Sequence, residues 1–322
     1  MAAPVPSRPA PEPPVGPGQG QGQGATAVLA RAPAPGAAVL GRRAAAVFVA
    51  PAFLLIAVFL AFPALWTLYL GITDYRLTGL AAAKPQVVGA ANYTQALTDP
   101  LFRGSLWITL LYVLGSAMIG QSCLGFALAW KLRDWRSPLR QVLEALVILA
   151  WIVPGSVVAF LWIALLDGQS GTLNAILPGQ VEWLLQFPLA SLIVFNIWRG
   201  TAFSMLLYGA ALNAVPPSHL ETARLAGAGG FQQLRDVVLP TIRGHVLTNL
   251  LLISLWTFND FTPFLLTRGG PNFRTEVLPI YLFRNAISAG ALGFGAAIST
   301  IMLVINLVIA LAYLRLLGER RR

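Results

Sequence analysis

Residues 221–240 read ETARLAGAGGFQQLRDVVLP, a polar and glycine-rich stretch that separates two strongly apolar segments of the chain. Inside a lipid bilayer, the backbone groups and charges of such a stretch would find no hydrogen-bond partners. We therefore expect this stretch at a membrane surface, facing water or another protein, while the apolar segments on either side cross the membrane. The pattern predicts an all-α fold, a polytopic bundle of membrane helices.

The composition of the whole chain agrees with a membrane protein. Hydrophobic residues make up 57% of the 322 residues and charged residues only 11%, whereas soluble domains carry roughly 25% charged residues. The net charge of +10 does not indicate nucleic-acid binding, because basic residues in short loops orient membrane proteins. The single Cys123 and the isolated His219 and His245 form no metal-ligand pattern, and we expect no metal site and no catalytic residue.

Six apolar stretches are long enough to cross the roughly 30 Å hydrocarbon core of a membrane. They cover residues 44–70, 105–130, 145–166, 188–213, 246–266 and 286–314. Before them, residues 1–40 are rich in proline, alanine, glycine and glutamine. Such a segment buries too little apolar surface to fold, so we expect a disordered tail followed by a transmembrane domain over residues 41–322.

The distribution of lysine and arginine predicts the orientation of the six spans. With the N-terminus inside, fifteen of these residues fall in inner segments and six in outer loops. Cytoplasmic loops carry the excess of positive charge. The expected protein is a multi-pass protein of the plasma (inner) membrane, with both termini and the loop over residues 214–243 in the cytoplasm.

The loop itself carries signals for two short helices. Ser218 and Glu221 form the pattern of a capping box at the start of a helix over residues 219–226. Gly227 is a suitable stop, because glycine adopts the left-handed conformation at a helix end. A second helix is expected over residues 231–238, and the proline two positions beyond it would end or kink that helix.

The spacing of the loop residues resembles the EAA loop of ABC importer permeases: Glu-Thr-Ala, three residues, glycine, nine residues, then Val-Val-Leu-Pro. Three further stretches resemble the carbohydrate-type members of that family. They are Leu-Thr-x-Gly-Gly-Pro at residues 266–271, WRGTAF at residues 198–203, and Gly89-x-x-Asn92-Tyr93. The resemblance covers Arg43 to Leu317, and it departs from the usual pattern at Thr222 and Ala226, where the family often has alanine and aspartate.

The resemblance implies a type I ABC importer permease fold with six spans and a role as the membrane subunit of an ATP-driven, binding-protein-dependent sugar importer. The loop would dock on the ATPase, with Glu221 as its main contact. The residues implied in this coupling are Glu221, Thr222, Ala223, Gly227, Leu239 and Pro240. The partners implied are an ABC ATPase dimer, a second permease subunit forming a heterodimer, an extracytoplasmic solute-binding protein, membrane lipid and a sugar, but no nucleic acid.

The chain is not expected to hydrolyse ATP itself. Its two lysines, Lys84 and Lys131, lie outside any Gly-Lys-Ser/Thr phosphate loop. By resemblance, ATP and Mg²⁺ would be bound by the partner ATPase, and this chain would hold no cofactor and catalyse no reaction.

Polar residues inside the spans are candidates for a substrate pathway, because charges in a membrane are costly and commonly face a cavity. The candidates are Arg199, Asn259 and Asp260, with Trp198 and Trp256 available to stack on a sugar. The alternative is that Arg199 and Asp260 serve packing or pair near a helix end. Three further residues are expected to form interhelical hydrogen bonds: Asn196, Asn249 and Asn306.

Two other functions remain open at this stage. One is a permease of another ABC importer class, for polyamines, phosphate or peptides. The other is a secondary transporter, although no internal repeat is evident and carboxylates are scarce in the spans. The sequence does not identify the sugar.

Overall fold

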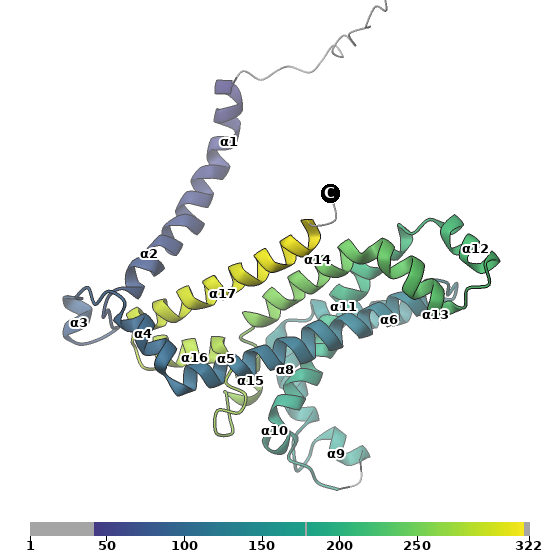
Figure 1. Ribbon diagram of the computed structural model, residues 1–322. Helices are drawn as coiled ribbons and strands as arrows, with labels where there is room; N and C mark the ends of the chain where they lie inside the picture. Colours follow the sequence, from purple (N-terminus) through teal and green to yellow (C-terminus); the bar gives the residue numbers. More distant parts are fainter. Residues whose placement is uncertain (1–41, 178, 319–322) are drawn as a thin grey trace, which may run out of the picture. The chain divides into compact units, whose positions relative to one another are not determined.

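The computed structural model describes residues 42–177 and 179–318, which are helical apart from turns, loops and one isolated bridge between Thr73 and Val87 (Figure 1). The chain divides into two units, Met1–Leu54 and Leu55–Arg322, and every contact discussed below lies within the second. The tail expected over residues 1–40 lies outside the described residues.

Five continuous helical segments are long and apolar enough to cross a membrane, and a bent pair of helices makes a sixth among the described residues. The segments are Ala46–Gly71, Pro100–Leu132, Pro188–Asn213, Gly230–Phe258 and Leu292–Gly318, and the pair is Pro138–Ile152 with Gly155–Leu165. Their elements are α1 (Arg42–Ile56), η1 (Ala57–Ala61), α2 (Phe62–Gly71), α5 (Pro100–Tyr112), η2 (Val113–Gln121), α6 (Ser122–Leu132), α7 (Pro138–Ile152), α8 (Gly155–Leu165), α11 (Pro188–Asn213), α13 (Gly230–Gln233), η3 (Leu234–Val238), α14 (Leu239–Phe258) and α17 (Leu292–Gly318), where η marks a π-helical turn.

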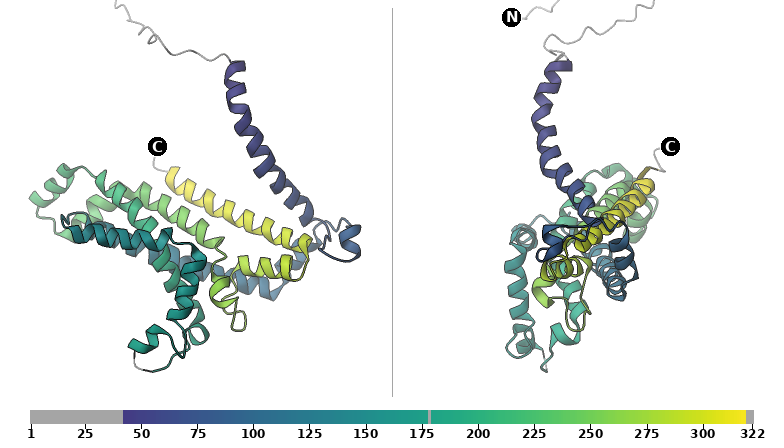
Figure 2. Two further views of the ribbon diagram at one scale, coloured as in Figure 1. Left: turned by 180° about the vertical axis from the view of Figure 1, so that it is seen from behind. Right: turned by 90° about the vertical axis from the view of Figure 1, so that its left-hand side faces the viewer.

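Shorter elements connect these segments: α3 (Leu80–Ala83), α4 (Ala91–Thr98), α9 (Thr172–Ile176), α10 (Trp183–Gln186), α12 (Pro217–Leu225), α15 (Pro263–Thr267), α16 (Leu278–Phe283) and η4 (Arg284–Ser288). The long helices α6, α11, α14 and α17 run alongside one another in both sets of views, with α12 and α13 at one end (Figures 1 and 2). The all-α membrane bundle expected from the sequence is thus confirmed.

The third membrane segment is broken rather than straight. The axes of α7 and α8 differ by 104°. The break falls at Val153, which is extended (ψ 134°) because it precedes Pro154, and the residue before a proline avoids the helical region. A single straight span over 145–166 is therefore not what the chain forms.

The fifth segment differs most from the expected span over 246–266. It starts at Gly230, because the helix continues through Pro240 instead of ending there. Pro240 lies two residues after the end of the π-helical turn η3, and such a wide turn accommodates a residue that cannot donate a backbone hydrogen bond. The segment ends at Phe258, so Asn259 and Asp260 lie in the turn after the helix and not inside it.

The last segment begins at Leu292, not at 286. Gly290 has φ +68°, a left-handed conformation that suits glycine and ends the preceding η4 turn. The expected span over 286–314 therefore contains this break near its start.

The continuous helical segment formed by α5, η2 and α6 packs very closely on α11. A methyl group on Gly125 would lie 2.5 Å from Ser204 Cβ and 2.8 Å from the backbone nitrogen of Met205. Small residues at such crossings let membrane helices approach until their backbones touch.

Buried amides join the spans, as the sequence predicted. Asn249 Nδ2 donates to Tyr208 Oη at 3.0 Å, and Tyr208 Oη lies 2.6 Å from Ser122 Oγ. The interhelical hydrogen bonds expected of Asn196 and Asn249 are formed, and Asn306 bonds to Asn259 in the turn after α14.

Candidate functional site

A cavity of about 600 Å³, lined by both polar and apolar side chains, opens between η2, α7, α11, α14 and the turn after α14. Its volume falls in the range of small-ligand sites. Four of the five candidate pathway residues line it, namely Arg199, Trp256, Asn259 and Asp260. Sequence reasoning brought these four together, although they are separated by up to 61 positions.

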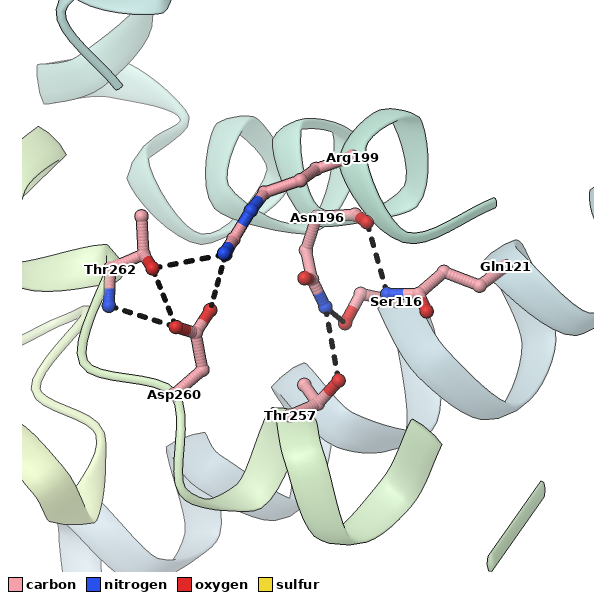
Figure 3. A network of polar contacts seen from close by, with 7 residues as sticks. All are labelled: Ser116, Gln121, Asn196, Arg199, Thr257, Asp260 and Thr262. Atoms are coloured by element: carbon pink, nitrogen blue, oxygen red, sulfur yellow. Dashed lines mark hydrogen bonds and ion pairs between the residues drawn. The ribbon is translucent and has the colours of Figure 1, made fainter. Parts of the chain in front are cut away.

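An ion pair occupies one wall of the cavity (Figure 3). Arg199 Nη1 lies 3.6 Å from Asp260 Oδ2 and donates to Thr262 Oγ1 at 3.0 Å. The other oxygen, Asp260 Oδ1, accepts from Thr262 Oγ1 at 2.6 Å and from the Thr262 backbone nitrogen at 3.0 Å. These bonds join α11 to the turn after α14, and the two charges offset each other. The sequence offered two interpretations of Arg199 and Asp260, a cavity lining or a packing pair. The structure shows both, since the two residues pair with each other and also line the cavity.

The guanidinium also touches the break between α7 and α8. A methyl group on Gly155, the first residue of α8, would lie 3.0 Å from Arg199 Nη2. A side chain at position 155 would crowd the arginine. Glycine at the break therefore leaves room for the guanidinium that pairs with Asp260.

Amide side chains form a further part of the cavity lining. Asn196 Nδ2 donates to Ser116 Oγ at 2.7 Å and lies 3.4 Å from Thr257 Oγ1, while Gln121 Nε2 donates to the Asn196 carbonyl at 3.0 Å (Figure 3). Asn259 and Asn306 exchange two side-chain hydrogen bonds, of 3.2 Å and 3.1 Å. Asn259 therefore lines the cavity while anchored to α17.

Aromatic rings complete the wall. Trp256 packs on Phe203 with ring centroids 4.7 Å apart, and Phe203 lies 6.1 Å from Trp151. Trp198, the fifth candidate, is not on the wall: its ring packs on Trp162 at 5.9 Å. Successive residues of a helix point about 100° apart, so a neighbour of Arg199 need not face the same cavity.

The lining residues that sequence reasoning missed include Gln121, Trp151 and Phe261. Gln121 could have been predicted to line a cavity, because it is an amide within a largely apolar span. Trp151 and Phe261 could not have been predicted in this way, since aromatic residues are common both in protein cores and on lipid-facing surfaces.

The loop over 214–243 forms a second candidate site, at the end of the bundle (Figure 1). Its first helix, α12, starts at Pro217 after the extended Pro216, and the expected capping box of Ser218 and Glu221 is absent. Proline suits the first helical position, where its missing N–H would be unpaired anyway. That prediction was wrong because the proline, and not the serine, starts the helix.

Gly227 ends α12 as expected, with φ +81°. Its nitrogen donates to the Arg224 carbonyl and the Ala228 nitrogen donates to the Ala223 carbonyl, both at 2.9 Å. This pair of bonds is the Schellman motif, which favours glycine at its left-handed position. Gly227 is therefore required by backbone geometry, whatever contacts the loop makes.

The loop rests on the bundle through one side and exposes the other. Leu220 is buried in a cluster with Leu132 and Val238. Glu221, Thr222 and Leu239 are exposed and Ala223 is half-buried. Two apolar side chains are highly exposed: Leu225 at 91% and Phe231 at 73%. The sequence did not single out these two, because a pattern of apolar residues does not reveal which ones remain uncovered.

A third polar cluster lies outside the spans, near α16. The Glu276 carboxylate is buried, with Oε1 2.6 Å from Arg284 Nη2, and Tyr281 donates a short hydrogen bond to Asp99. Burial raises the pKa of Glu276 to about 6, against the opposing effect of Arg284. Burial and the Asp99 carboxylate likewise raise the pKa of Tyr281. No group of His, Cys, Asp and Glu that could hold a metal occurs within residues 42–177 and 179–318.

Comparisons with known proteins agree on one family. The model of the "binding-protein-dependent transport system inner membrane component" family matches residues 121–322. A probable ABC transporter permease protein of Pyrococcus horikoshii is 30% identical over 83% of this chain and 93% of its own length. The trehalose/maltose transport system permease protein of Thermococcus litoralis is 29% identical over 84% of this chain and 92% of its own.

A solved structure supports the fold. The crystal structure of a bacterial ABC transporter involved in the import of the acidic polysaccharide alginate matches 86% of this chain and 95% of its own, with a TM-score of 0.73 and 20% identity. At that identity the match concerns the fold, and it agrees with the type I permease fold expected from the sequence. The chain therefore belongs to the family of inner membrane components of binding-protein-dependent transport systems.

Proposed function

We propose that this chain forms half of the translocation pathway of an ATP-driven sugar importer and couples to its ATPase through the loop over residues 214–243. One observation carries the proposal: a single helical segment, Gly230–Phe258, joins the exposed loop to the cavity. The relatives support a sugar, since one is named for trehalose and maltose.

The continuous segment would transmit movement between the two sites. Its 29 residues correspond to about 43 Å at the α-helical rise. Its first turn belongs to the loop, and its last turn carries Trp256 and Thr257 on the cavity wall. A displacement of the loop by a closing ATPase dimer would move the cavity wall as part of the same body, which is the kind of rigid change that alternates access.

The lining of the cavity suits an uncharged sugar. Tryptophan faces can stack on the apolar face of a sugar ring, and the amides of Asn259 and Gln121 can pair with hydroxyl groups. The charge of Arg199 is already offset by Asp260 at 3.6 Å. The cavity in this subunit therefore presents hydrogen-bonding groups without a net charge.

The other subunits of the transporter complex would be separate chains. We propose an ABC ATPase dimer that binds ATP and Mg²⁺, a second permease subunit of different sequence and an extracytoplasmic solute-binding protein. Glu221 would be the main docking contact, with Ala223 and Gly227 allowing close approach and Leu239 and Pro240 leading into the membrane helix. Both termini would lie in the cytoplasm.

Purification of the tagged chain from its native membrane tests the proposal. We expect an ABC ATPase, a second permease and a solute-binding protein in the eluate, and sugar uptake in proteoliposomes only with ATP. Screening the binding protein against sugars, polyamines, phosphate and peptides would then identify the substrate class. Active transport by this chain alone without ATP would refute the proposal in favour of a secondary transporter.

A further inference from the structure

The turn between α6 and α7 holds a dense cluster of positive charge. Four basic residues occur within ten positions: Lys131, Arg133, Arg136 and Arg140. Two are neutralised locally, because Arg133 pairs with Asp134 at 3.2 Å and Arg140 with Glu144 at 2.7 Å. Lys131 and Arg136 form no ion pair within residues 42–177 and 179–318.

A pocket of about 540 Å³ lies at this turn. Its lining consists of Trp135, Arg136, Ser137, Pro138, Arg140, Gln141 and Glu144, the last being the ion-pair partner of Arg140. Its shape is fixed by Arg140, whose Nη1 donates to the backbone carbonyls of Arg133 at 3.2 Å and Trp135 at 3.4 Å. The turn thus offers a formed polar pocket with one uncompensated guanidinium, that of Arg136.

An apolar stripe on α7 starts directly at the pocket. Its four side chains are all about half exposed or more: Leu139, Val142, Leu146 and Leu149. The spacing of three, four and three residues places them on one face of the helix. From Leu139 to Leu149 the helix rises by ten steps, about 15 Å, which matches half of a hydrocarbon core roughly 30 Å thick.

Tryptophan marks the level of the membrane surface at the same place. Trp135 is exposed beside the pocket, and Arg133 stacks over the Trp130 ring at 4.6 Å. Indole rings favour the headgroup layer. The cationic pocket therefore lies at headgroup depth, and the stripe descends from it at acyl-chain depth.

We propose that this surface binds one anionic glycerophospholipid, with its phosphate at Arg136 and an acyl chain along Leu139, Val142, Leu146 and Leu149. The charge of the pocket selects the anionic headgroup, and the length of the stripe selects a lipid over a free phosphate. The inference does not depend on the proposed sugar transport.

The position of the site suggests what the lipid does. Leu132, one residue beyond Lys131, is buried against Leu220 of α12 in the same cluster. A lipid held at the turn would brace the end of α6 on which the exposed loop rests. The lipid would thus stabilise the coupling end of the bundle.

Native mass spectrometry of the full-length chain in detergent tests the proposal. The chain is titrated with phosphatidylglycerol or with phosphatidylcholine of identical acyl chains. We expect about tenfold preference for phosphatidylglycerol, and about fivefold weaker phosphatidylglycerol binding in Arg136→Gln, as one basic contact contributes at a membrane surface. Arg315→Gln is the matched control, because Arg315 is an exposed arginine at the end of α17 and should leave the preference unchanged.

Several results would overturn the proposal. Equal retention of the two lipids would remove the charge selectivity, and equal losses in Arg136→Gln and Arg315→Gln would reduce it to a general surface effect. Displacement of bound phosphatidylglycerol by inorganic phosphate would indicate an anion site without a lipid. A preference seen in the isolated chain but absent from the complex with its partner chains would assign the surface to a partner subunit.

Discussion

The exposed loop around α12 and the cavity around Arg199 are built in opposite ways. The loop keeps its shape by backbone bonds, such as those of the Schellman motif at Gly227, while Glu221, Leu225 and Phe231 project into the surroundings. The cavity is held by side chains that bond one another across helices. A change in the exposed side chains of the loop should therefore affect function alone, whereas a change in the cavity should affect both stability and function.

The largest effect is expected at the protruding side chains of the loop. Leu225→Asp should leave the chain folded and inserted but reduce ATP-dependent uptake at least about 30-fold, because apolar anchors at the centre of an interface commonly contribute 2 kcal/mol or more. Uptake and ATP hydrolysis by the assembled complex provide the measurement. Leu80→Asp is the control, since Leu80 is 80% exposed but lies in α3. Equal losses in both variants would contradict a docking role for Leu225.

The next largest effect is expected at the ion pair of the cavity. Arg199→Gln should lower the stability of the chain by about 1–3 kcal/mol and also reduce uptake, because Asp260 would keep a half-buried charge without its cation. The double variant Arg199→Gln with Asp260→Asn should recover part of the stability but not the uptake. Thermal unfolding in detergent measures the coupling between the two substitutions. Additive losses would show that the two groups do not act as a pair.

A finer comparison separates two tryptophans of similar exposure. Trp256 lines the cavity at 52% exposure, whereas Trp198 at 45% does not. Trp256→Ala should raise the KM for sugar uptake up to about tenfold, through loss of an aromatic contact, while Trp198→Ala should change it less than twofold. Uptake kinetics at saturating binding protein give the readout. A larger effect at Trp198 would place the sugar path on the other face of α11.

The smallest effect is expected at Glu276, away from both sites. Its pKa is raised from 4.5 to about 6, so the folded chain binds this proton more tightly than the unfolded chain. The corresponding stabilisation is complete below pH 4.5 and is lost as the pH rises to about 6, on the order of 1–2 kcal/mol. In Glu276→Gln this part of the pH dependence should vanish. Melting temperatures measured between pH 4.5 and 7 in both chains would test it, and parallel curves would contradict it.

Features that depend on a local sequence pattern were predicted correctly. Features that depend on contacts with other parts of the chain were missed. Apolar length was sufficient for the number of spans, and spacing was sufficient for Gly227. The passage of the helix through Pro240 was missed, because it depends on the π-helical turn at Leu234–Val238. Trp198 was wrongly assigned to the cavity. Which face of α11 points to the cavity depends on how α11 packs against its neighbouring helices, and the sequence of α11 alone does not contain that information.

The close crossing of α6 and α11 limits how the chain can change during evolution. At Gly125 even one added methyl group would meet Ser204 Cβ at 2.5 Å. Replacing Ser204 by glycine would remove this side-chain contact, but the Met205 nitrogen at 2.8 Å and the Ser204 carbonyl carbon at 3.0 Å belong to the backbone and would remain. Position 125 is therefore expected to stay glycine among descendants of this chain, whatever residue stands at position 204.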